Sequence, residues 1–113
     1  MTVSPEYREH VMQRLAQVGT IQDRRLFGEV GLYADDLIFG MMVDDALYFK
    51  VNYSNRADYE AEGIEPFVAP WSGRPTSYYE VPASVLDDPQ RLSAWVGKAV
   101  AVAASKPKKT KKR

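Results

Sequence analysis

The sequence contains no cysteine among its 113 residues. This absence excludes thiolate catalysis, disulfide bonds and zinc or iron–sulfur sites that are built on cysteine. A chain without thiols fits a reducing compartment, so we expect a cytoplasmic protein.

Long apolar runs are also missing. No stretch approaches the roughly 18 residues that a membrane helix needs, and residues 1–19 carry charged side chains where a signal peptide would be apolar. We therefore expect neither membrane insertion nor secretion. A chain of this length can bury about 60 to 70% of its unfolded surface around one core, which predicts a single domain.

The composition has no net charge, because 15 Lys and Arg balance 15 Asp and Glu. The last nine residues nevertheless hold six basic and no acidic side chains, which leaves nine basic against 15 acidic residues elsewhere, a net charge of −6. The basic residues of this tail are Lys106, Lys108, Lys109, Lys111, Lys112 and Arg113. Because the tail has no apolar residue to bury, we predict a folded domain over residues 1–104 and a disordered basic tail over residues 105–113.

Helical periodicity marks both ends of the predicted domain. Ser4 followed by Pro5 is typical of a helix N-terminus, and apolar residues spaced four, four and three apart predict an amphipathic helix that ends at Gly19. Asp88 and Pro89 repeat this signature. The last helix is predicted from an apolar stripe: Leu92, Trp95, Val96, Ala99, Val100 and Ala103.

A period of two marks the middle of the chain. A strand over residues 26–33, interrupted by two glycines, precedes an alternating hairpin over residues 37–43 and 47–51. The turn of this hairpin is predicted at Asp44 and Asp45.

A short helix and two more strands follow. Ser54 or Asn55 can cap the helix, and Gly63 is typical of its end. Strands are predicted over residues 67–71 and 76–81. The order of elements predicts an α+β fold, with an antiparallel sheet of about five strands and the N- and C-terminal helices packed on one face.

The second face of the predicted hairpin is unusually apolar. Odd-numbered residues from Leu37 to Val43 can supply the core, yet Ile38 and Met42 on the opposite face are apolar as well, near Tyr48. Two interpretations remain open: the terminal helices cover these residues, or they form a homodimer or partner interface.

Catalytic candidates are few. His10 has no partner at helical spacing, and the carboxylate pairs at residues 35–36, 44–45 and 87–88 lie where turns or helix caps favour Asp. The sequence lacks a Walker lysine and the three glycines of a dinucleotide-binding loop. We therefore assign no catalytic residue, metal ligand or cofactor.

Nucleic-acid contact has two possible sources. Trp71, Tyr78 and Tyr79 can stack bases, with Arg74 and Lys50 adding charge, but an acidic body argues against this and favours a core role for these aromatic residues. The basic tail is the better candidate, because up to about six cations give salt-dependent, sequence-independent affinity. A purely solubilising tail is the alternative.

Five short motifs follow one another in a recognisable order: Arg25-Leu26-Phe27-Gly28, Val30-Gly31-Leu32-Tyr33, Leu47-Tyr48-Phe49-Lys50-Val51, Gly63 with Pro66-Phe67, and Ser77-Tyr78-Tyr79-Glu80-Val81-Pro82. In this order they resemble the N-terminal domain of the TfoX/Sxy family, bacterial proteins associated with the regulation of natural competence. The resemblance implies an α+β fold similar to the secretion-chaperone-like architecture, and no enzymatic activity or cofactor. This chain has Glu29 where the family usually has a second glycine, and the tail stands where full-length relatives have a helical domain.

Three functional hypotheses follow. The first is a non-enzymatic regulatory or adaptor domain that acts by protein contact, with a homodimer as one form of that contact. The second is a nucleic-acid-associated accessory protein that uses the tail. The third is a small enzyme or ligand carrier with a pocket around Lys50, Tyr33 and Tyr79.

Overall fold

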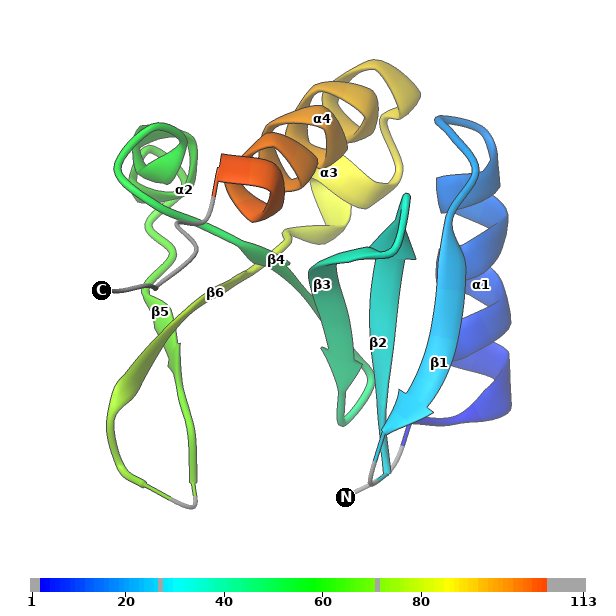
Figure 1. Ribbon diagram of the computed structural model, residues 1–113, viewed down its shortest axis with the longest axis horizontal. Helices are drawn as coiled ribbons and strands as arrows, with labels where there is room; N and C mark the ends of the chain where they lie inside the picture. The colour runs from blue at the N-terminus through cyan, green and yellow to red at the C-terminus, as the bar shows by residue number, and fades with distance from the viewer. Residues whose placement is uncertain (1–2, 27, 71, 106–113) are drawn as a thin grey trace, which may run out of the picture.

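The fold is an antiparallel sheet packed against helices (Figure 1). A computed structural model describes residues 3–26, 28–70 and 72–105. The elements are α1 (Pro5–Ala16), β1 (Gln22–Leu26), β2 (Glu29–Ala34), β3 (Leu37–Val43), β4 (Ala46–Lys50), α2 (Arg56–Glu60), β5 (Pro66–Val68), β6 (Pro75–Glu80), α3 (Ala83–Leu86) and α4 (Pro89–Ser105). The predicted α+β class is confirmed.

The first helix begins as its sequence predicts. The Ser4 side chain accepts a hydrogen bond from the Tyr7 backbone N–H, and Pro5 occupies the first helical position. Val11 and Leu15 are the buried residues of α1, one helical turn apart. The helix ends at Ala16, three residues before the predicted end at Gly19.

The sheet has six strands in the order β1-β2-β3-β4-β6-β5, one more than predicted. The predicted strand over residues 26–33 is a hairpin, because Gly28 adopts a left-handed backbone (φ 86°) between β1 and β2. Strand β1 extends back to Gln22 through polar and charged residues. Such a segment shows no apolar alternation, which is why the sequence pattern missed it.

Two aspartate pairs form hairpin turns, as the sequence predicts. Asp35 and Asp36 have φ values of 51° and 65°, and Asp44 and Asp45 have 51° and 58°. A two-residue loop with positive φ at both positions is a type I′ turn, which matches the twist of the strands that it joins. These aspartates therefore have a structural role in the turns.

Asp36→Gly is expected to raise the free energy of unfolding by about 0.5 to 1 kcal/mol, because glycine adopts positive φ without strain. The ion pair between Asp36 and Arg24 is exposed and 3.8 Å long, so its loss costs little. Urea unfolding measures the effect. Asp36→Ala is the control, and it should be less stable than the glycine variant; equal stabilities would contradict a strained turn.

The register of β3 changes in its middle. Leu32 pairs with Gly40, whereas the next residue, Tyr33, pairs with Ile38, so Phe39 is an extra residue in β3. Such a β-bulge turns two consecutive residues to the same face. Phe39 and Gly40 are both buried.

The bulge inverts the predicted faces of β3. Met42 lies opposite the buried Leu47 and is fully buried in the core, so its predicted position on the second face is wrong. Met41 lies opposite Tyr48 and is only half-buried, so its predicted position in the core is wrong as well. Past the bulge, the even-numbered Gly40 and Met42 face the core, and Val43 at the end of the strand is buried as predicted.

One apolar core joins the helices to a single face of the sheet. Buried residues from all four helices belong to the same cluster as Leu32 and Phe49. In α4 the buried residues follow the predicted stripe, except that Val102 is buried and the predicted Val100 is only half-buried: Leu92, Trp95, Val96, Ala99, Val102 and Ala103. Figure 1 shows α4 and α3 above the sheet and α1 beside β1.

Tyr59 lies at the centre of the aromatic part of the core. Its ring centroid is 4.4 Å from that of Trp95 and 5.4 Å from that of Tyr79, and only 1% of the residue is exposed. The hydroxyl group is buried and makes no hydrogen bond to the described residues. Burial, and then the charge of Asp58, raise the pKa of Tyr59 above its ordinary value.

Tyr59→Phe is expected to raise the free energy of unfolding by about 1 kcal/mol near neutral pH, because it removes a buried hydroxyl that has no partner. Because the pKa of Tyr59 is higher in the folded state, the stability that this shift contributes is fully present below the unfolded pKa of 10.0. It is lost as the pH rises above that value. The wild type should therefore lose about 1.4 kcal/mol per pH unit more than the variant. Equal alkaline slopes in urea titrations would contradict the raised pKa.

Candidate protein-contact surface

The face of the sheet opposite the helices carries aromatic and charged side chains. Residues that lie opposite each other in the register share a face, and this links Met41 to Gly31 and Tyr48, and Tyr48 to Glu80. We call this surface the open face. It is formed by Arg24, Tyr33, Ile38, Met41, Tyr48, Lys50, Phe67, Tyr78 and Glu80. Figure 1 draws none of the described helices below β4, between β3 and the β5–β6 hairpin.

Side chains of the open face pack on one another. The ring centroids of Tyr48 and Phe67 are 4.8 Å apart, and the Arg24 guanidinium lies 4.7 Å from the centroid of the Tyr33 ring. Arg24 also pairs with Asp36 at 3.8 Å. The three aromatic residues Tyr33, Tyr48 and Phe67 are half-buried. The surface is therefore ordered by its own contacts.

Lys50 and Tyr78 lie opposite each other on the open face. The Lys50 ammonium lies 5.8 Å from the centroid of the Tyr78 ring. Burial raises the pKa of Tyr78, and the nearby Tyr33 raises it further. Burial and then Glu80 also raise the pKa of Tyr48. These tyrosines remain neutral hydrogen-bonding groups at neutral pH.

The structure separates the three predicted interface residues. Ile38 and Tyr48 lie on the open face, but Met42 lies in the core. Met41 takes the place that the alternation gave to Met42. The sequence carried one signal of this change, because Gly40 stands inside an apolar strand and such a glycine often marks a bulge.

The predicted pocket residues Lys50, Tyr33 and Tyr79 do not come together, although Lys50 lines a cavity without the two tyrosines. Tyr79 is buried on the helix side of the sheet against Tyr59, whereas Lys50 and Tyr33 lie on the open face with Tyr78. The core role predicted for Tyr79 is confirmed, whereas the core role predicted for Tyr78 is wrong, because Tyr78 is half-buried on the open face. Trp71 lies outside the described residues.

The catalytic candidates have other roles or no partner in the described part of the chain. His10 is exposed on α1. The Asp88 side chain accepts hydrogen bonds from the backbone N–H groups of Gln90 and Arg91 at the start of α4. Across residues 3–26, 28–70 and 72–105, no three His, Asp or Glu side chains gather to hold a metal ion. Within the same residues, no helix is long and apolar enough to cross a membrane.

The predicted nucleic-acid residues of the tail, from Lys106 to Arg113, lie outside the described residues. In the described part, several of the basic side chains pair with acids. Arg8 and Asp23 lie 2.7 Å apart, and Arg91 and Glu62 lie 2.9 Å apart. The charges of these two arginines are therefore balanced by neighbouring acids.

Comparison with known proteins gives one result. The chain matches the family model described as the TfoX N-terminal domain over residues 13–103. This range contains every strand of the sheet and all of the open face. A search of curated proteins finds no match to the chain. The matched range covers most of the sequence, and the chain therefore belongs to the TfoX N-terminal domain family.

Proposed function

We infer that the chain is a non-enzymatic regulatory or adaptor domain that acts by protein contact, and that the open face is its contact surface. One observation carries this proposal: Tyr33, Tyr48, Phe67 and Tyr78 share a sheet face without a helix from the described residues. Family membership supports a regulatory role, because the TfoX resemblance implies an association with the regulation of natural competence and of transcription.

The chemistry of the open face suits a protein partner. Tyrosine and arginine are enriched among residues that dominate binding energy. Tyrosine buries a large area with few rotatable bonds, and the planar guanidinium of arginine donates several hydrogen bonds in a fixed geometry. The contacts of Arg24 with Tyr33 and of Tyr48 with Phe67 already order these side chains. Less rotamer entropy is then lost on binding. The face also carries both signs of charge, Lys50 and Glu80 among them, which favours a mixed protein surface over a polyanion.

The test uses two neighbouring arginines of β1. Arg24 lies opposite Gly31 on the open face, whereas Arg25 lies opposite the buried Val30 on the helix side. We expect Arg24→Ala to weaken binding of a captured protein partner by about tenfold or more, as a hot-spot residue does, and Arg25→Ala to leave it unchanged. Calorimetry with the purified partner measures both. Equal losses would indicate a general charge effect and contradict the open face as the contact surface.

Self-association is one form of this contact. Met42 no longer supports it because it is buried, whereas Ile38, Met41 and Tyr48 do. Light scattering at micromolar concentration should show a dimer that Met41→Lys dissociates. A strict monomer would remove the homodimer from the proposal and leave a different protein as the partner.

A second candidate function is nucleic-acid association through the basic tail, favoured by six cations in nine residues on an acidic body. Removal of residues 106–113 is expected to abolish binding to duplex DNA. In the full chain, the logarithm of the affinity should fall with the logarithm of the salt concentration with a slope of up to about −5. Unchanged affinity in the shortened protein would contradict a role for the tail.

A further inference from the structure

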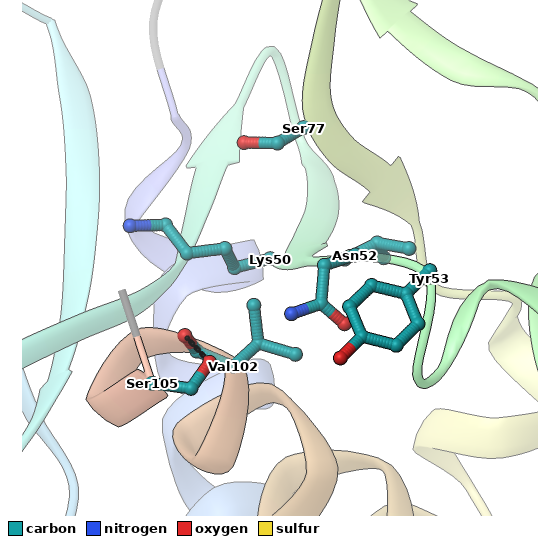
Figure 2. Close-up of a pocket in the computed structure, with 7 residues that line it drawn as sticks. Lys50, Asn52, Tyr53, Ser77, Val102 and Ser105 are labelled. Carbon is teal, nitrogen blue, oxygen red and sulfur yellow. Dashed lines mark hydrogen bonds between the residues drawn. The ribbon is translucent and has the colours of Figure 1, made fainter. Parts of the chain in front are cut away.

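A cavity of about 360 Å³ lies where β4 ends, at the border of the open face, with which its described lining shares only Lys50. It is bounded by the loop that follows β4, by β6 and by the last turn of α4. Figure 2 shows Ser77 above this space, Lys50 and Tyr53 on its two sides, and Val102 with Ser105 below. Its volume is in the range of small-molecule sites in proteins.

The loop that forms one wall is held in place by a buried side chain. Asn55 is 2% exposed, its Oδ1 accepts a hydrogen bond from the Asn52 N–H, and its Nδ2 donates to the Lys50 carbonyl. The Val51 N–H donates to the Ser77 carbonyl at 2.7 Å, which fixes the loop against β6. Hydrogen bonds of the folded chain therefore fix this wall of the cavity.

Several polar groups of the lining can donate hydrogen bonds. The Asn52 Oδ1 accepts from the backbone and side chain of Ser54, which leaves its Nδ2 as a donor, and Figure 2 shows this nitrogen directed toward Val102. Lys50 supplies a positive charge, and Ser77 and Tyr53 supply hydroxyl groups. Acidic residues are absent from the described lining, although residues 1–104 as a whole carry a net charge of −6.

The lining is also polarised. Val51 and Val102 supply apolar surface, and the end of α4 brings the negative end of a helix dipole to the side of Val102. An anionic group is therefore favoured on the side of Lys50 and Ser77, away from the helix end. An apolar group is favoured between the two valines.

We propose that this cavity binds a small organic carboxylate, with the carboxylate at Lys50 and Ser77 and a compact apolar group against Val51 and Val102. The site shares Lys50 with the open face, whereas its other described lining residues lie outside that surface.

The test compares benzoate with benzamide, which has nearly the same shape and no charge. Titration of the full chain is followed by NMR shifts of backbone amides. We expect benzoate to shift the amides of Asn52, Ser77 and Val102, and benzamide to bind at least about tenfold more weakly, because a hydrogen bond between charged groups is stronger than a neutral one.

Variants locate the charge. Lys50→Met should weaken benzoate binding about tenfold, whereas Lys50→Arg should retain it. Arg74→Met is the matched control, since Arg74 is exposed in the β5–β6 turn and does not line the cavity. Equal binding of the two probes, equal losses in the Lys50→Met and Arg74→Met variants, or shifts confined to other parts of the chain would each overturn the proposal.

Discussion

Met42→Lys is expected to unfold the protein, whereas Met41→Lys is expected to leave it folded. Met42 is fully buried opposite Leu47, and a charge placed there without a partner costs several kcal/mol. That cost is comparable to the whole stability of a domain, about 5 to 15 kcal/mol. Met41 is half-buried on the open face, from which a lysine can extend into water.

Circular dichroism and urea unfolding of both variants measure this difference. Met42→Leu is the control, and it should cost less than about 1.5 kcal/mol because it keeps the apolar volume. Strict alternation along β3 predicts the reverse order of stabilities. A Met41→Lys variant that is less stable than Met42→Lys would therefore contradict the bulge.

Gly40→Ala is expected to lower the free energy of unfolding by about 1 to 3 kcal/mol, and Gly40→Val by more. A Cβ atom at residue 40 would lie 2.8 Å from the Tyr48 carbonyl oxygen and 3.0 Å from Cδ1 of Phe49. The carbonyl belongs to the backbone of the neighbouring strand and cannot move without breaking the sheet. Glycine is therefore required at this position of β3.

The control for this substitution is Gly97→Ala. Gly97 is exposed on α4, and a Cβ atom there would meet no atom within 4 Å. Alanine favours a helix over glycine by about 1 kcal/mol, so this variant should be more stable than the wild type. Thermal unfolding separates the two cases, and a Gly40→Ala variant as stable as Gly97→Ala would refute the close approach.

Much of the fold is readable in the sequence because its signals are local. Ser4 with Pro5 and Asp88 with Pro89 mark helix starts through short-range hydrogen bonds, and the aspartate pairs mark turns by their backbone preferences. The apolar stripe of α4 gives the buried side of that helix. Each of these features depends on residues that are close together in the sequence.

The features that the sequence did not reveal depend on partners far along the chain. The bulge at Phe39 is set by pairing with β2, and a single extra residue exchanges the two faces for the rest of the strand. Strand β1 is polar because it lies at an edge. The open face was predicted only in part for the same reason: Met41 replaces Met42, and Phe67 joins Tyr48 from another hairpin.

Site-specific photo-crosslinking in cells tests most directly whether the open face is the contact surface. A photoreactive amino acid is placed at Met41 on the open face or, as the control, at the exposed Ala94 of α4. The account predicts crosslinks to protein, either a partner or a second copy, from residue 41 and none from residue 94. Crosslinks from residue 94 alone, or crosslinks from residue 41 to nucleic acid, would contradict it.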